Sequence, residues 1–234
     1  RWNHPERGLL GPMSFIPFAE QGGLIDEIGR HVLSRACDEA LAWVELAGPA
    51  APSVSVNLSP RQLLDPDLPD HVEGLLRSRD LAPERLVLEI TESALMEDRA
   101  GAGPSLQRLG RLGVRLAIDD FGTGYSSLAY LQQFPVHLLK IDGSFVDDSL
   151  TTPGWSLAEA IVQISHALGL VPIAEGIESE EQAAALTAFG CDLGQGWHLG
   201  RPMDTAAARQ LVADELGAAR GGVAAQARER ASSA

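Results

Sequence analysis

The feature that most constrains the fold of this chain is a repeated alternation of short apolar runs with longer segments of helical period. Six runs are rich in Val, Ile and Leu on both faces, as buried strands are: SVSVNLS (53–59), RLVLEITES (85–93), VRLAIDD (114–120), HLLKID (137–142), VPIAEGIE (171–178) and CDLGQG (191–196). Strands that are apolar on both faces need cover on both sides. Strand, helix and strand in repeated succession predict a parallel sheet with helical crossovers.

The segments between these runs carry helical patterns and helix-start signals. The stretch 24–44 predicts one long helix. Capping boxes are expected where Ser156 precedes Glu159 and where Ser179 precedes Gln182, because each pair can satisfy two backbone N–H groups at a helix start.

Six strands at this spacing favour an α/β fold of the modified TIM (β/α)8 barrel type, with two strands still to be supplied. No convincing strand precedes the run at 53–59, and the chain opens on RWNHPERG rather than on Met, so we expect the first strands upstream of Arg1. We expect residues 1–216 to form one domain, an N-terminally incomplete barrel. The small-residue stretch 217–234 is expected to be a flexible C-terminal tail.

The net charge and the cysteine content limit which partners this chain can bind and in which cellular compartment it works. The net charge is −14 and Lys and Arg do not cluster, which argues against binding a nucleic-acid polymer or an anionic membrane directly. Cys37 and Cys191 lie far apart in no metal-ligand spacing and are expected to be packing residues in a reducing compartment. No apolar run is long enough to span a bilayer. We therefore expect a cytoplasmic domain, with any membrane anchor elsewhere in the parent protein.

Each predicted strand is expected to end in one or more polar residues. They are Asn57, Glu89, Asp119, Asp120, Lys140, Asp142, Glu175, Glu178 and Gln195. The carboxyl ends of barrel strands converge on one face, where the active sites of such enzymes lie. Any one of these residues could equally be a helix cap or a solvated strand end. Because all of them would meet on one face, together they predict an active site there.

The oxygen ligands in this set suit a hard cation. Asn57, Glu89, Asp119 and Asp120 include no Cys or His, so Mg²⁺ or Mn²⁺ fits better than Zn²⁺. Adjacent Asp119 and Asp120 could serve two neighbouring ions, with one carboxylate bridging them, as in phosphoryl transfer. Strand-end carboxylates also serve enolate chemistry, so another metal-dependent barrel enzyme stays open at this point.

Three further features have two interpretations each. Lys140 would either orient water and neutralise phosphate charge or form a structural ion pair among the acids. Glu175 would be a general base or an outer carboxylate. Gly122 and Gly124 would give a mobile loop with positive φ, or an ordinary strand-to-helix turn.

Eight strings in the chain resemble the EAL-domain family of bacterial cyclic di-GMP phosphodiesterases. They are RWNHPERG, FIPFAEQGGLI, VNLSPRQL, LEITES, DDFGTGYSSLAYL, LKID, AEGIES and QGWHLGRP, and they span about residues 1–203. The resemblance implies a modified TIM barrel that cuts cyclic di-GMP to linear pGpG with two Mg²⁺ or Mn²⁺ ions.

The resemblance also implies roles for single residues at the centre of the site. The implied metal ligands are Asn57, Glu89, Asp119 and Asp120. Asp119 would be shared between the two ions. Lys140 would position the hydrolytic water, and Glu175 would assist as base or ligand.

Outer roles follow from the same resemblance. The implied substrate-binding residues are Arg1, Asp142, Glu178 and Gln195. Glu92 would anchor a flexible loop that couples the metal site to a homodimer, and that loop comprises Phe121, Gly122, Thr123, Gly124, Tyr125 and Ser126. An upstream sensory or cyclase domain of the GGDEF type is also implied for the parent protein.

The departure from the family lies at the start of the chain. The glutamate that names the family would stand four positions before Arg1, outside this sequence. With it, we expect an active hydrolase. The alternative is a receptor or interaction scaffold that binds cyclic di-GMP or a protein without cutting, although such members usually lose acidic ligands that this chain keeps.

Overall fold

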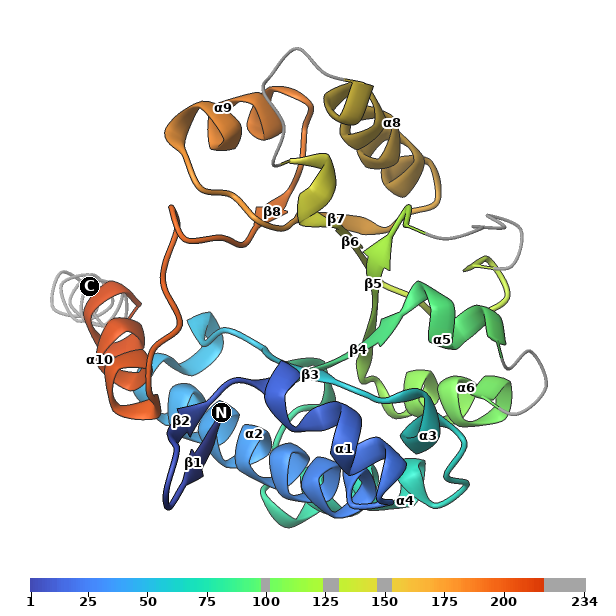
Figure 1. The fold of residues 1–234 in the computed structure, drawn as a ribbon, viewed down its shortest axis with the longest axis vertical. Coiled ribbons are helices and arrows are strands. Elements are labelled where there is room, and N and C mark those ends of the chain that lie inside the picture. The colour runs from blue at the N-terminus through green and yellow to red at the C-terminus, as the bar shows by residue number, and fades with distance from the viewer. Residues whose placement is uncertain (98–101, 124–130, 147–152, 217–234) are drawn as a thin grey trace, which may run out of the picture.

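The chain folds as a curved parallel sheet with helices packed on its outer side (Figure 1). The structure is a computed structural model and describes residues 1–97, 102–123, 131–146 and 153–216. Its elements up to the second sheet strand are β1 Trp2–His4, β2 Gly8–Leu10, η1 Pro12–Ser14, α1 Ile16–Gln21, α2 Ile25–Ala47, η2 Gly48–Ala50, β3 Val54–Asn57, α3 Pro60–Leu63, α4 Leu68–Ser78, η3 Pro83–Arg85 and β4 Leu86–Thr91. The remaining elements are α5 Glu92–Glu97, α6 Ala102–Leu112, β5 Arg115–Phe121, β6 Leu138–Ile141, η4 Gly143–Phe145, α8 Pro153–Ala167, β7 Val171–Ala174, α9 Glu180–Ala188, β8 Leu193–Gly194 and α10 Thr205–Glu215.

The large sheet contains all six predicted strands. They pair in parallel in the order β3-β4-β5-β6-β7-β8, so each strand lies beside the next one in the chain, as in a TIM barrel. The predicted α/β fold of TIM-barrel type is therefore confirmed. Among the described residues the sheet has β3 and β8 as free edges, so it forms an open arc of six strands rather than a closed barrel of eight.

The outer face of the sheet carries the main hydrophobic core. Leu88, Ile118 and Leu139 alternate with the residues of the inner face, and they pack with side chains such as Leu109 of α6 and Ile161 of α8. All five are at most 2% exposed. The middle strands are buried on both faces, which is why their sequences lack a polar alternation.

Of the two capping boxes predicted at helix starts, one is present and one is absent. The capping box of α9 is confirmed, because Gln182 N donates to Ser179 Oγ at 3.3 Å and Ser179 N donates to Gln182 Oε1 at 3.0 Å. The prediction of a capping box at Ser156 is wrong, because α8 already begins at Pro153 and Ser156 lies inside the helix. Proline has the φ of a first helical residue and needs no N–H there, so the helix starts one turn early.

Two features near the chain ends were not predicted. β1 and β2 form an antiparallel hairpin that pairs Trp2 with Leu10, although we expected no strand there. Strands of three residues are too short to leave a detectable alternation. Near the other end, α10 is held to α2 by Arg209, whose Nε lies 2.7 Å and Nη2 3.0 Å from the Glu39 carboxylate. None of the described helices has the length and apolar character needed to cross a membrane.

Candidate active site

The candidate site is built on the inner face of the sheet, above a small apolar cluster of β4, β5 and β6. Because side chains in a strand alternate between faces, the next positions on this face hold Glu89, Asp119 and Lys140. They are only 7%, 8% and 4% exposed. All three residues, and Asp120 with them, lie within β4, β5 and β6 and not at the strand ends, which corrects the expected position.

Lys140 stands at the centre of three carboxylates. Its Nζ lies 2.8 Å from Glu89 Oε2, 2.8 Å from Asp119 Oδ1 and 2.6 Å from Glu175 Oε1. Burial alone would lower the pKa of Lys140, but these carboxylates outweigh it and hold the pKa above its ordinary value. Lys140 is therefore a permanent ammonium, and the ion pair among the acids, one of its two interpretations, is present.

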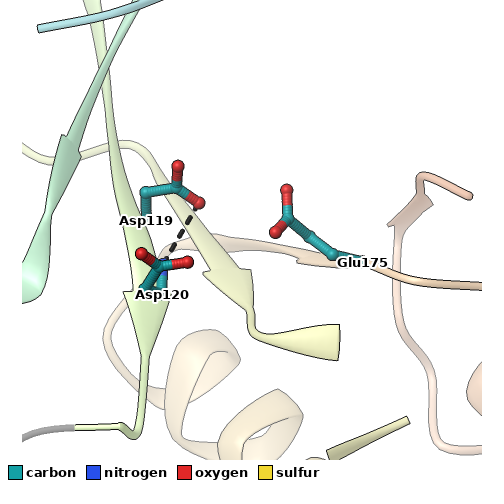
Figure 2. A group of neighbouring side chains, drawn as sticks. All are labelled: Asp119, Asp120 and Glu175. Carbon is teal, nitrogen blue, oxygen red and sulfur yellow. Dashed lines mark hydrogen bonds between the residues drawn. The ribbon is translucent and has the colours of Figure 1, made fainter. Parts of the chain in front are cut away.

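A backbone irregularity brings Asp119 and Asp120 to one side of β5. Adjacent residues of a regular strand point to opposite faces, but the pairing of β5 with β6 shifts register between Ile118 and Phe121. Asp120 has φ +54°, a left-handed conformation that Asp tolerates better than most residues. Its N–H donates to Asp119 Oδ1 at 3.1 Å. Figure 2 shows both carboxylates near each other, with Glu175 reaching toward them from the segment after β7.

Burial, with neighbouring charges adding to it, raises the pKa of two of these acids, Asp120 and Glu175. Burial, followed by the charges of Asp119 and Asp142, raises the pKa of Asp120 above its ordinary value. Burial also raises the pKa of Glu175, with Asp119 and Glu89 adding to the effect and Lys140 opposing it. Asp142 also caps η4 by accepting from Ser144 N at 2.9 Å. The site thus gathers more carboxylates than its one ammonium can neutralise.

This donor set fits a hard divalent cation. Asp119, Asp120 and Glu175 each offer a carboxylate oxygen, and these oxygens all lie within 4.8 Å of one another. Lys140 balances one of its three carboxylate partners, so negative charge remains in a buried place. Oxygen-only ligands and surplus negative charge are what Mg²⁺ and Mn²⁺ require. The residues could therefore hold a metal ion.

The loop after β5 is tied to the start of α5 by Glu92. The Gly122 N–H donates to Glu92 Oε2 at 2.9 Å, and Glu92 is only 3% exposed. Gly122 has φ +98°, the positive φ that the sequence predicted, and Thr123 Oγ1 donates to the Asp120 carbonyl at 2.8 Å. Phe121 was expected in the loop but is the buried last residue of β5. The predicted loop residues Gly124, Tyr125 and Ser126 lie outside the described residues.

A cavity of about 550 Å³ opens beside the acidic group and contains three of the predicted residues, Glu175, Glu178 and Gln195. Its wall includes Trp197, over whose ring the Arg201 guanidinium carbon lies at 5.0 Å from the centroid. This cation–π pair was not predicted, although an aromatic residue two positions after Gln195 was a usable signal. The cavity is large enough for part of a nucleotide.

Two predicted residues are exposed and are not part of the buried group. Asn57 ends β3 in register with Glu89, but its side chain is exposed. Arg1 is exposed as well, and its guanidinium lies against Gly11. Within the described part of the chain, no ion pair or hydrogen bond joins either residue to the carboxylates around Lys140.

Comparison with known proteins gives one consistent family. The EAL domain family profile matches residues 1–202. The bifunctional diguanylate cyclase/cyclic di-GMP phosphodiesterase MucR of Pseudomonas aeruginosa is 42% identical over 91% of this chain and 31% of its own length. Cyclic di-GMP phosphodiesterase NbdA of the same organism is 43% identical over 91% of this chain and 27% of its own length. The chain thus spans about a third or less of these relatives.

The solved structures agree with this result. The PaMucR phosphodiesterase in complex with c-di-GMP superposes with a TM-score of 0.82 at 43% identity, covering 87% of this chain and 82% of that one. The EAL domain of Pseudomonas aeruginosa FimX bound to c-di-GMP gives a TM-score of 0.79 at 28% identity, covering 86% and 81%. Fold, strand-borne carboxylates and family profile agree, and the chain belongs to the EAL domain family.

Proposed function

We propose that this chain hydrolyses cyclic di-GMP to linear pGpG. The observation that carries the proposal is the buried group of carboxylates around Lys140, because no structural need explains an excess of acids there. The family relation supplies the substrate, since relatives are named cyclic di-GMP phosphodiesterases and the solved structures of PaMucR and of the FimX EAL domain hold c-di-GMP.

In this reaction water attacks one phosphorus atom, and the bond from phosphorus to the 3′ oxygen breaks. Lys140 Nζ would orient the attacking water and offset charge on the phosphate. Glu175 would take the water proton, a role that its raised pKa favours. The leaving 3′ oxygen gains a proton, and the product carries a 5′ phosphate.

We propose that Asn57, Glu89, Asp119 and Asp120 hold two Mg²⁺ or Mn²⁺ ions, with Glu175 nearby as base or additional ligand. Bound ions would supply Lewis-acid stabilisation of the charge that develops on the phosphodiester. Glu178, Gln195 and Asp142 would line the substrate path. Arg1 would contact a phosphate once the substrate is bound.

The primary test is chromatography of cyclic di-GMP incubated with the full natural protein and Mg²⁺ or Mn²⁺. We expect pGpG as the product, formed only when a divalent ion is present. If a folded, metal-supplied protein binds the dinucleotide and yields no product, the chain is a receptor and the proposed hydrolysis is refuted.

Divalent ions should stabilise the folded protein, because they bind carboxylates that otherwise repel one another. At a hundredfold excess over the dissociation constant, we expect Tm to rise by about 5 to 10 °C. Asp120→Asn should lose most of this rise, and Asn tolerates the left-handed φ of that position. Glu27→Gln changes the charge equally on the exposed start of α2 and serves as the control. An undiminished rise in Asp120→Asn would place the ions elsewhere.

Further proposals concern the parent protein. The name of MucR supports a cyclase domain of the GGDEF type in the same polypeptide, and an upstream sensory domain would fit the same pattern. We also propose that the domain works in the cytoplasm as a homodimer, with Glu92 linking the loop after β5 to the metal site. Residues 1–216 would form the domain, and 217–234 would form a tail.

A further inference from the structure

Three of the candidate site residues share a local pattern: each is followed by a glycine. The pairs are Asp142–Gly143, Glu175–Gly176 and Gln195–Gly196, on the loops after β6, β7 and β8. Each of these glycines packs closely against the backbone of a neighbouring loop. A side chain at Gly176 or Gly196 would therefore push apart the loops that carry the polar residues.

The contact between Gly143 and Gly176 is made by backbone alone. A Cβ atom on Gly176 would lie 3.0 Å from Gly143 Cα, closer than real Cβ atoms normally approach. A Cβ atom on Gly143 would lie 3.4 Å from Gly176 Cα and 3.7 Å from the Glu175 carbonyl carbon. An alanine would therefore be crowded at Gly176, whereas a Cβ atom on Gly143 would only fill the remaining van der Waals contact between the two loops.

The loop after β8 also packs against the loop after β7 through a glycine, Gly196. A Cβ atom on Gly196 would lie 2.1 Å from Ile177 O, so that position also requires glycine. Hydrogen bonds join these loops directly, since Ile177 N donates to Gln195 O at 3.1 Å and His198 N donates to Ile177 O at 3.0 Å. The loop that carries Glu175 is thus fixed on both sides.

These contacts between the loops after β6, β7 and β8 determine where the Glu175 carboxylate lies. Its carboxylate lies 2.6 Å from Lys140 Nζ, and it follows β7 directly, one residue before Gly176. Lys140 stands on β6, the strand that leads into Asp142 and Gly143. The pairing of β6 with β7 ends with Glu175 N donating to Ile141 O at 3.1 Å, and the contact between the two glycines keeps the loops equally close beyond that hydrogen bond.

We infer that Gly176, through its backbone contact with Gly143, is a positioning residue that holds Glu175 at the Lys140 ammonium and the Asp119–Asp120 pair. This inference rests on the proposed hydrolysis of cyclic di-GMP. It assigns Gly176 no contact with substrate, and its effect reaches the reaction only through the placement of the Glu175 carboxylate.

The chain supplies a matched control at the other end of β7. Gly169 has φ +72°, almost the same as the +71° of Gly176, but a Cβ atom there would meet nothing within 4 Å. Gly176→Ala and Gly169→Ala therefore carry the same backbone strain, and only Gly176→Ala crowds a neighbour. Gly169→Ala should lower Tm by about 4 °C, as expected for one alanine in a left-handed conformation. Gly176→Ala should lower Tm by more, because the crowding against Gly143 adds to the same strain.

Activity and metal binding should separate the two variants. We expect Gly176→Ala to lose about 10-fold in kcat, with KM nearly unchanged, and to bind Mn²⁺ about 10-fold more weakly in an electron paramagnetic resonance titration. Gly169→Ala should match the natural protein in both measurements. Equal kcat and equal Mn²⁺ affinity in the two alanine variants would overturn the inference while leaving the proposed function intact.

A second variant covers the case in which Gly176→Ala does not fold. Gly143 lies outside the left-handed region, and a Cβ atom there would already be in van der Waals contact with the opposite loop, so the two methyl groups of Gly143→Val should push that loop away without the strain. We expect the same loss of kcat and of Mn²⁺ affinity. A Gly143→Val protein with natural kcat would contradict the inference. If the natural protein forms no pGpG, the proposed hydrolysis is refuted. The Mn²⁺ titration then still tests whether Gly176 places the Glu175 carboxylate.

Discussion

Asp119→Asn should abolish nearly all hydrolysis, with kcat falling by about 10³-fold or more, while Tm in the absence of metal stays within a few degrees of the natural value. The substitution keeps the shape of the side chain and removes one of the charges that a bound cation would share. It also removes one carboxylate from a group that already has too many, which offsets the lost ion pair with Lys140 at 2.8 Å. Steady-state formation of pGpG and a thermal melt measure the two effects.

A distant aspartate provides the control for net charge. Asp67→Asn makes the same charge change at an exposed position before α4 and should leave kcat unaltered. A large loss of Tm together with retained activity in Asp119→Asn would show that Asp119 supports the fold rather than the reaction.

Lys140→Met should cause the largest loss of stability of any single substitution in the site. Methionine fills a similar volume, but the carboxylates of Glu89, Asp119 and Glu175 would face one another without their cation. Removing one partner of a buried ionic group costs about 3 kcal/mol, which corresponds to about 10 °C in Tm for a domain of this size. Hydrolysis should be lost as well.

The pH dependence of this variant gives a sharper test of its cause. In the natural protein the pKa of Glu175 is already raised, first by burial, and removal of Lys140 would raise it further. A carboxyl group with a raised folded pKa binds protons more tightly in the folded state, so stability grows as pH falls through that pKa toward the unfolded value near 4. The Tm deficit of Lys140→Met should therefore shrink between about pH 8 and pH 5.

Thermal melts of both proteins over that pH range, without metal, measure the deficit. Lys140→Arg keeps the charge and serves as the conservative control, with a smaller loss of Tm. A deficit that stays constant with pH would mean that lost packing, and not carboxylate repulsion, destabilises the variant.

The strands and most of the site residues were predictable because they leave short-range signals. Apolar runs marked all six strands of the sheet, and Glu89, Asp119 and Lys140 were conspicuous as charges within those runs. Their convergence also follows from topology, because parallel neighbours in register bring their inner faces together. Ser179 and Gln182 could be paired in advance for the same reason, since a capping box is a local motif.

The parts that could not be predicted depend on backbone geometry or on distant contacts. No pattern in VRLAIDDF reveals the register shift in β5, so the sequence alone left open how Asp119 and Asp120 share a face. The stacking of Arg201 on Trp197 and the approach of Gly143 to Gly176 depend on how separate loops settle against each other. The hairpin at Trp2 was missed because its strands are too short for periodicity to emerge.

The irregular step in β5 also bears on how such a site could be moved to another scaffold. A designer who copied only the adjacent aspartates into a regular strand would obtain one carboxylate on each side of the sheet. The transferable unit is the strand together with its bulge and the left-handed Asp120, whose φ restricts that position to aspartate, asparagine or glycine. The acidic pair is thus a property of backbone shape as much as of side-chain chemistry.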